Sequence, residues 1–596
     1  MGRAGARVVG QAQRGDGAAC LSGIARPKIS RMFRGTIQAG TKVVFTKHGL
    51  MARSRQASRP TIIGTRRTQR SRAGPPAAIR IGIRKAEDMQ PLTYVMFAVY
   101  ATAVFLLFVY GVNSYYMMYQ FIRNRRASES RDKEIAREFW EKTRPEELPD
   151  ITIQLPIYNE QYVVERLIFH ACNIDYPKGK LEIQVLDDST DETRDLVARI
   201  VTRQRALGHD IHHITRPNRE GYKAGALKHG MALCRGEFIA IFDADFMPPK
   251  DFLYQTVPYF SDPGIGLVQT RWGHVNADYS FLTMAQSIGI DGHFVVEQAG
   301  RTWGGLFMNF NGTAGIWRKS AIESAGGWQA DTLTEDMDLS YRAQLVGWRM
   351  HFLYQVETPA EIPVDINAFK SQQHRWAKGS IQTAKKILPM LLASKQPLRR
   401  KVQAVIHVTH YLVHPLMVTV ALLSVPMLRT FEFHVGPVGF TLMVIGLLIS
   451  TSGPSSLYIF SQRMLNPIGW RKRAAFIPAL MFVGTGIAVS NTKAVLEALV
   501  GKESGFVRTP KLNIMHRGES VGDRKYRMPL RPIFLMELFM GAYCFAGFLL
   551  YTQSGKYLIG PFLAIYTMGF TYTAIMSILH SLEGPAARFS EKAVNA

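Results

Sequence analysis

The chain has 596 residues, which is long enough for one large catalytic domain together with a helical membrane portion. Charged residues make up only 20% and hydrophobic residues 47%, which directs attention to long uninterrupted apolar runs. Its four cysteines, Cys20, Cys172, Cys234 and Cys544, form no CxxC pair and no metal-ligand spacing, so we exclude a disulfide framework and a structural zinc site.

The net charge of +26 is concentrated at the beginning of the chain. Residues 1–88 contain 19 Lys or Arg and three acidic residues, and so carry +16 of it. This basic segment has no amphipathic period and is rich in Arg, Gly, Ser and Ala, which is typical of a disordered extension or a targeting segment. A translation start at Met89, directly before the first hydrophobic run, is an equal alternative. Nucleic-acid binding by the segment is the outside alternative, and we expect no nucleic-acid partner.

Charge-free stretches predict five transmembrane helices. The first lies in residues 89–124 and is followed by a basic flank that indicates the cytoplasmic side. The second and third lie in 401–462, and the fourth and fifth in 532–582. Residues 583–596 are then expected to form a cytoplasmic tail.

A sixth apolar stretch, residues 474–492, is weaker and contains Gly484, Gly486 and Asn491. The linkers on both sides of it are basic, and the positive-inside rule places both linkers in the cytoplasm. A full span between them would separate them, so we predict an interfacial helix instead. Residues 463–531 are therefore assigned to the cytoplasm as an interfacial helix and a following loop.

Between residues 125 and 400 the pattern changes to short β-like runs that alternate with helix-compatible stretches. The runs 151–158, 182–186, 237–242 and 266–269 have the composition of buried strands. This alternation predicts an α/β domain in the cytoplasm, with an interfacial helix at its end. In such sheets ligands bind at the carboxyl ends of the strands.

Two pairs of aspartates follow two of these predicted strands. Asp187 and Asp188 come after 182–186, and Asp243 and Asp245 come after 237–242. Either pair alone is equally compatible with a turn or a helix cap. A nucleotide-diphosphate leaving group needs a hard divalent cation, which takes carboxylate and phosphate oxygens. With the motifs downstream, the pairs predict a site for a nucleotide-diphosphate sugar and Mg²⁺ or Mn²⁺.

A third acidic motif, Thr334, Glu335 and Asp336, stands where a helix-compatible run begins. An N-cap threonine followed by acids that the helix dipole favours would explain this composition. The functional alternative is that Asp336 is a general base, because inverting glycosyl transfer needs a carboxylate to take the proton from the acceptor hydroxyl.

The string QQHRW places Gln372, Arg375 and Trp376 in a basic, helix-compatible stretch before the second span. An Arg beside a Trp is typical of a membrane-interface anchor. Alternatively, Arg375 binds the diphosphate and the ring of Trp376 offers an apolar face to the acceptor sugar.

The set DDS, DAD, TED and QxxRW resembles family 2 of the glycosyltransferases, which includes cellulose, chitin and hyaluronan synthases. Longer strings, such as VLDDSTD, NREGYKAGALKHGM, FIAIFDADF, FNGTAGIWR and QQHRWAKG, resemble plant cellulose synthase-like proteins of the A and C groups and their bacterial relatives. The resemblance covers roughly residues 150 to 380. It implies a GT-A catalytic domain with a Rossmann-like nucleotide-sugar site, inserted among transmembrane helices, and inverting chemistry beside a polymer channel.

The resemblance also implies roles for individual residues. It assigns Asp336 as the catalytic base and Asp243 and Asp245 to the metal and the diphosphate. The string GFVRTPK is similar to the gating loop that closes over the donor in processive members, although any basic cytoplasmic loop would fit the string. The residues expected to bind donor or acceptor are Asp187, Asp188, Lys223, Asn311, Gly312, Thr313, Glu335, Gln372, Arg375, Trp376, Phe506, Arg508, Thr509 and Lys511.

Together these features predict a processive hexosyltransferase that polymerises a β-linked, β-1,4, glucan or mannan from UDP-glucose or GDP-mannose and translocates it. The first alternative is a non-processive enzyme that adds sugar to a lipid acceptor, and the second is a transporter or scaffold with a degenerate transferase domain. Expected partners are the donor, the growing glycan, membrane lipid and an export partner. We expect an integral protein of the plasma or inner membrane, or of the Golgi in a eukaryote, with a cytoplasmic catalytic domain.

Overall fold

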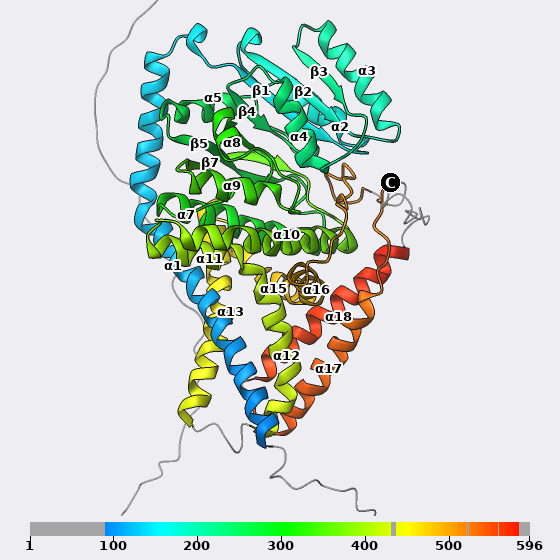
Figure 1. Cartoon of the computed structure of the whole chain (residues 1–596). Coiled ribbons are helices and arrows are strands. Elements are labelled where there is room, and N and C mark those ends of the chain that lie inside the picture. Colours follow the sequence, from blue (N-terminus) through cyan, green and yellow to red (C-terminus); the bar gives the residue numbers. More distant parts are fainter. Residues whose placement is uncertain (1–89, 431–436, 520, 522–523, 558, 583–596) are drawn as a thin grey trace, which may run out of the picture. The chain divides into compact units, whose positions relative to one another are not determined.

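The computed structural model describes residues 90–430, 437–519, 521, 524–557 and 559–582 (Figure 1). The basic extension 1–88, with Cys20, as well as Met89 and the tail 583–596, lie outside the described residues.

A seven-stranded mixed sheet forms the centre of the α/β domain, with the strand order β3-β2-β1-β4-β6-β5-β7. The first four strands along the chain are parallel to one another, β6 is antiparallel to both of its neighbours, and β7 is parallel to β5. The strands are β1 (Ile151–Ile157), β2 (Leu181–Asp187), β3 (Ile211–Thr215), β4 (Phe238–Ile241), β5 (Ile265–His274), β6 (Gly315–Arg318) and β7 (Arg349–Ala360).

Each predicted strand coincides with one of these, namely β1, β2, β4 or β5, and the expected Rossmann-like α/β fold is confirmed. Strand β5 is longer than predicted, because its second half, TRWGH, is polar yet pairs with β7. Strands β3, β6 and β7 were missed because they are short, or because polar side chains interrupt their apolar pattern.

Both faces of the sheet are buried, which is why its central strands read as continuous apolar runs. Along β4, Phe238 and Ala240 belong to the hydrophobic cluster on one face, while Ile239 and Ile241 belong to the cluster on the other. This is the two-residue period of a strand. The helices of this domain are α2 (Val164–Cys172), α3 (Thr193–Ala206), α4 (Tyr222–Leu233), α5 (Phe252–Thr256), α6 (Phe281–Asp291), α7 (Ala299–Trp303), α8 (Lys319–Ser324) and α9 (Glu335–Leu345).

Five helices in the described part of the chain are long and apolar enough to cross a membrane. The first, α1, runs on without a break for 53 residues, or about 80 Å, so that its second half lies along the α/β domain (Figure 1). The five helices are α1 (Gln90–Lys142), α12 (Val413–Thr430), α13 (Pro437–Leu465), α17 (Ile533–Gln553) and α18 (Gly560–Leu582).

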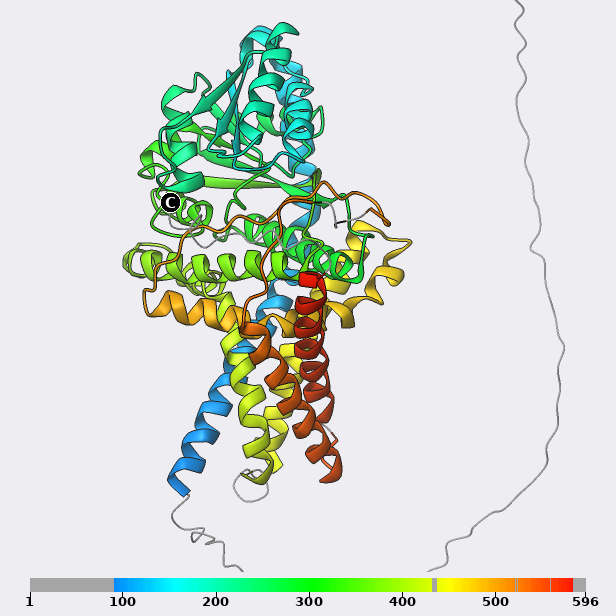
Figure 2. The same cartoon turned by 90° about the vertical axis from the view of Figure 1, so that its right-hand side faces the viewer.

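A layer of helices lies between the sheet and the apolar helices (Figure 2). The stretch predicted as one interfacial helix is two helices, α15 and α16, with a bend of 43° between the helical segments. Helix α16 packs against α10 and α12, and α15 packs against α18 and α6. The helices of the layer are α10 (Ile366–Ala393), α11 (Leu398–Val408), α14 (Trp470–Ala474), α15 (Ile477–Gly486) and α16 (Ala488–Leu499).

A buried ion pair fixes α10 to the apolar helices. The Lys370 ammonium lies 2.8 Å from the carboxylate of Glu537 on α17 and 3.2 Å from the Ser577 hydroxyl on α18. All three residues are buried. Removal of one partner would leave an uncompensated buried charge, so the pair links α10 to α17 and α18 in a way that a single substitution would disrupt.

Candidate active site

The sequence-predicted site residues converge on one pocket at the carboxyl ends of β1, β2 and β4. All but two of the predicted residues line it. Those that do are Asp188, Lys223, Asp243, Asp245, Asn311, Gly312, Glu335, Asp336, Gln372, Arg375, Trp376, Phe506, Arg508, Thr509 and Lys511.

The two exceptions are Asp187 and Thr313, which lie behind the pocket wall. Asp187 is the last residue of β2, and it accepts hydrogen bonds from the Ser189 amide and the His213 ring, both at 2.9 Å. Burial opposes its ionisation, but these two partners outweigh burial and lower the pKa of Asp187. The Thr313 hydroxyl accepts a hydrogen bond from the Asp243 amide at 2.9 Å and so supports the pocket from behind.

Asp243 and Lys223 form the floor of the pocket. The Lys223 ammonium lies 2.5 Å from the Asp243 carboxylate and donates to the Gly312 carbonyl at 2.9 Å. Burial opposes a charged Lys223, but Asp243, Glu335 and Asp336 outweigh it and raise the pKa of the ammonium. Lys223 therefore stays positive and joins the aspartate motif to the loop that carries Gly312.

Asp336 stands in the first turn of α9, where its carboxylate accepts the Met337 amide at 2.7 Å. Burial and then the neighbouring Glu335 raise the pKa of Asp336 to about 7, against the opposing effect of that hydrogen bond. Thr334 occupies the N-cap position, but its hydroxyl contacts the Thr383 hydroxyl at 3.1 Å and makes no capping bond. Thr334 therefore stands where an N-cap residue stands, as that explanation expects, but its side chain does not cap the helix.

Gly312 lets its loop approach Asp336 closely. Its φ is +82°, and a Cβ placed on it would lie 3.0 Å from a carboxylate oxygen of Asp336 and 3.5 Å from the Lys223 ammonium. Any larger residue would therefore combine backbone strain with crowding of both side chains. The adjacent Asn311 is held by Gln298 at 2.6 Å and by the His293 ring at 3.1 Å.

Asp243 and Asp245 together form a carboxylate pair that suits a hard cation. Each pairs with one lysine, Asp243 with Lys223 and Asp245 with Lys511. The second oxygen of Asp245 is buried and has no hydrogen-bond partner within the described residues. No group of three or more His, Cys, Asp or Glu with metal-binding geometry occurs in the described ranges. Two carboxylates are nevertheless enough for Mg²⁺, which completes its octahedron with phosphate oxygens and water.

The loop that follows α16 reaches across the pocket. Phe506 stacks on Tyr222 with the ring centroids 5.8 Å apart, and the Arg375 guanidinium lies 4.5 Å from the Phe506 ring centroid. Farther along, Glu361 accepts the backbone amides of Leu512 and Asn513, both at 3.0 Å, which fastens the far end of the loop.

Several residues in this region were not predicted from the sequence. Glu160 lies just after β1, lines the pocket and pairs with Arg508 at 3.5 Å; its burial raises the pKa of its carboxyl. Arg216 after β3 binds both oxygens of Asp188, at 3.0 and 2.5 Å. Arg219 lies with its guanidinium 3.3 Å from the Tyr158 ring centroid. Of these residues, only Glu160 could have been found from the sequence, because it follows a predicted strand.

Trp376 connects the pocket to the apolar helices. It lines the pocket, and it also packs against a buried cluster that contains Tyr411 together with Leu412 directly before α12. Gln372, one turn earlier on α10, lines the same pocket. The acceptor side predicted for these two residues therefore faces the beginning of an apolar helix.

Comparison with known proteins gives a consistent result. Residues 149–379 match the model of the glycosyltransferase-like family 2. Glucomannan 4-beta-mannosyltransferase 9 of Arabidopsis thaliana is 34% identical over 438 residues, which cover 71% of this chain and 80% of that protein. Probable glucomannan 4-beta-mannosyltransferase 11 of Oryza sativa subsp. japonica is 44% identical over 253 residues, which cover 42% of this chain and 44% of that protein. A mannosyltransferase from Pyrobaculum calidifontis in complex with GDP-Man and Mn²⁺ matches at a TM-score of 0.43 and 19% identity, over 68% of this chain and 100% of that chain.

Proposed function

Because the chain belongs to glycosyltransferase family 2, in its cellulose synthase-like group, and is a hexosyltransferase, we propose that it polymerises a β-1,4-linked mannan from GDP-mannose. We further propose that it is processive and that it passes the product between its apolar helices. The observation that carries the proposal is the meeting of Asp336, Asp243 and Asp245 in one pocket. The names of the two plant relatives favour mannose over the alternative donor, UDP-glucose.

Asp336 is the proposed base of an inverting transfer. The acceptor hydroxyl loses its proton to the Asp336 carboxylate while its oxygen bonds to the anomeric carbon of the donor, and the bond from that carbon to the diphosphate breaks on the opposite face. A pKa of about 7 suits this role, because the group is substantially ionised at neutral pH and still basic enough to accept the proton.

The donor diphosphate is proposed to lie between the carboxylate pair and the basic residues of the pocket. Asp243 and Asp245 would hold Mg²⁺ or Mn²⁺, which supplies positive charge to the leaving diphosphate. Arg375 has a buried Nε atom without a hydrogen-bond partner in the described part of the chain, so it is available to an incoming phosphate oxygen. Asp188 and Lys223, which line the same pocket, are assigned to the nucleotide.

The loop with Phe506, Arg508, Thr509 and Lys511 is proposed to open when the donor enters. The pocket has a volume of about 150 Å³ with the loop in its present position, well below the roughly 300–1,000 Å³ of typical ligand pockets. Closure over the donor would exclude water and suppress hydrolysis of the activated sugar. The proposal that the donor binds beneath this loop is supported by Thr509. Its hydroxyl is buried and has no hydrogen-bond partner among the described residues.

Processive growth is supported by the position of Trp376. An acceptor sugar stacked on its ring would have its terminal hydroxyl toward Asp336 and its other end toward the beginning of α12. We propose that the catalytic domain faces the cytoplasm of the plasma or inner membrane, or of the Golgi, and that an export partner receives the glycan.

The test is incorporation of labelled sugar by purified protein in liposomes with Mg²⁺ or Mn²⁺, from GDP-mannose and separately from UDP-glucose. Ethanol-insoluble product from GDP-mannose that a β-mannanase degrades is the expected result. Product from UDP-glucose alone, degraded by a β-glucanase, would replace the proposed donor. Label found only in extracted lipid would establish the non-processive alternative, and no incorporation from either donor would contradict both.

A further inference from the structure

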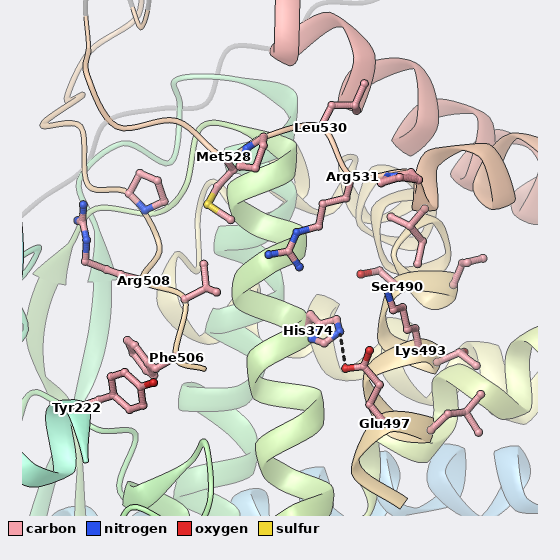
Figure 3. A pocket seen from close by; sticks show the side chains of 18 of the residues that line it. Tyr222, His374, Ser490, Lys493, Glu497, Phe506, Arg508, Met528, Leu530 and Arg531 are labelled. Carbon is pink, nitrogen blue, oxygen red and sulfur yellow. Dashed lines mark ion pairs between the residues drawn. The ribbon is translucent and has the colours of Figure 1, made fainter. Parts of the chain in front are cut away.

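A second and much larger cavity lies beside a different face of α10 (Figure 3). Its volume is about 2570 Å³, more than twice the roughly 300–1,000 Å³ of pockets for small ligands. His374 lines it, whereas its motif neighbours Gln372, Arg375 and Trp376 line the catalytic pocket. His374 is thus the titratable residue of QQHRW that faces this cavity and not the catalytic pocket.

The walls of this cavity are mainly apolar, and one side of them comes from α12, α16 and α17, whereas residues 158–159, 217–222, 506–510 and 528–532 contribute much of the rest. Helices α12 and α17 are among those long enough to cross a membrane. Two of the wall residues, Met536 and Phe539, keep 53% and 58% of their area exposed, so the wall lacks a covering partner within the described residues. The apolar wall residues on or directly beside these helices are Val418, Leu422, Val489, Leu496, Val500, Ile533, Met536, Phe539 and Met540.

The polar part of the cavity has an excess of positive charge. Lys493 and Arg531 both line it, and neither side chain has an ion pair or hydrogen bond within the described ranges, although Glu497 lies near enough to favour the charged form of Arg531. Its acids are Glu220, at the end near the donor pocket, and Glu497, which already has three basic neighbours. These neighbours are Lys378 at 3.3 Å, His374 at 3.6 Å and Lys502 at 3.9 Å.

His374 contributes no charge to this region at neutral pH. Burial, and then the nearby Arg531, lower the pKa of His374 to about 4, although Glu497 opposes the shift. Figure 3 shows Arg531, His374, Lys493 and Glu497 directed into the same space. The side chains therefore offer two unpaired cations at the edge of an apolar space, which is the arrangement that an amphipathic anion requires.

We propose that this cavity binds one anionic phospholipid of the surrounding membrane, with its phosphate at Lys493 and Arg531 and its acyl chains against α12 and α17. Binding rests on insertion of the apolar helices in a membrane and not on the identity of the donor. An effect on catalysis rests on the proposed function, because Phe506 and Arg508 line both cavities. A lipid in place would pack against the loop that covers the donor pocket and stabilise its closed position.

The experiment uses the full chain in nanodiscs of phosphatidylcholine that contain phosphatidylglycerol with a photoreactive acyl chain. After illumination, cross-links mapped by mass spectrometry are expected in residues 418–422 and 533–540. The double variant Lys493→Gln/Arg531→Gln should lower their yield by about tenfold or more, the effect of removing two basic contacts to an anionic lipid. The matched control Arg471→Gln/Lys472→Gln removes two exposed basic residues of α14 that do not line the cavity, and should leave the yield unchanged.

Competition with the unmodified protein tests the site without any variant. Unlabelled phosphatidylglycerol should compete with the probe, and phosphatidylcholine should not. Equal competition by both lipids, or cross-links that the double variant leaves unchanged, would overturn the proposal. Competition by inorganic phosphate would show a phosphate site instead of a lipid site. Transfer of labelled sugar to the bound lipid would show that the cavity holds an acceptor. These results are separable from failure of the proposed function, because cross-linking needs no donor.

Discussion

The two cavities on either side of α10 are lined in part by the same loop, yet their charges are arranged in opposite ways. In the catalytic pocket, cations and carboxylates are paired with one another, as in Lys223 with Asp243 and Lys511 with Asp245. In the larger cavity, the side chains of Lys493 and Arg531 form no ion pair within the described residues, and Glu497 acts on Arg531 only from a longer distance. The pocket is thus proposed to hold its reactive groups in place before substrate arrives, whereas the cavity is proposed to take an anion from outside the chain.

The contrast extends to what each space exposes. The pocket is small and lined by buried polar groups, so a ligand there must exchange existing ion pairs for its own contacts. The cavity is large and apolar, so a ligand there gains mainly from covering exposed side chains. If this distinction is correct, substitutions in the pocket should change the transfer of sugar. Their expected effects differ in size from one residue to the next.

The largest effect is expected for Asp336→Asn. An amide cannot accept the proton of the acceptor hydroxyl, so the rate of transfer should fall by about 10²–10⁴-fold while donor affinity is kept. Calorimetric titration with donor and metal, alongside incorporation of labelled sugar, measures the two quantities. Asp331→Asn, at an exposed ion pair with Lys386, is the control and should retain activity. Loss of donor binding in a folded Asp336→Asn protein would contradict the role as base.

The next largest effect is expected for Gly312→Ala. The new methyl group would crowd the Asp336 carboxylate and the Lys223 ammonium, and displacement of the base by a fraction of an ångström to about 1 Å should cost up to about 10²-fold in rate. Kinetics and thermal unfolding should be measured together.

Gly327→Ala is a matched control for this change. Gly327 also has a positive φ, of +72°, but a Cβ placed on it meets nothing within 4 Å. Both variants should lose about 1–2 kcal/mol of stability from backbone strain, and only Gly312→Ala should lose transfer. Equal losses of activity would show that strain alone is responsible.

A smaller effect is expected for Trp376→Ala. Loss of the stacking surface should weaken acceptor engagement by about tenfold, or about 1.4 kcal/mol, and shorten the product, with little change in donor affinity. Gel filtration of the product and a donor titration measure the two effects. Trp470→Ala, on α14 outside both cavities, should leave product length unchanged. A larger loss of donor affinity than of product length would contradict the acceptor role.

The smallest effect is a shift in the pH profile of Glu335→Gln. Asp336 accepts a proton only as the carboxylate, so kcat/KM should fall as the pH drops below its pKa of about 7. Glu335 raises that pKa by repulsion, after burial, so its neutralisation should move the acid limb to lower pH. Glu335→Asp keeps the charge and should keep the limb near its original position. An acid limb that moves to higher pH in Glu335→Gln would contradict the assignment.

The sequence by itself determined the class of the fold and most of the candidate pocket. Asp188, Asp243 and Asp245 follow the ends of apolar strands. Because the carboxyl ends of parallel strands meet at one edge of a sheet, these side chains are expected at the same edge. Length and absence of charge were enough to find the five apolar helices. These are local properties, in which spacing along the chain fixes spacing in the structure.

Only the tertiary structure decided which side chains face which space. Asp187 and Asp188 are neighbours, but Asp187 ends β2 and turns to His213, whereas Asp188 lies in the following loop and faces the pocket and Arg216. His374 and Trp376 belong to one motif, but the helical turn of about 100° per residue sends them to different cavities. Arg508 and Glu160 are 348 positions apart and meet because the loop crosses the pocket. No local pattern records such a contact, because it depends on how distant elements pack.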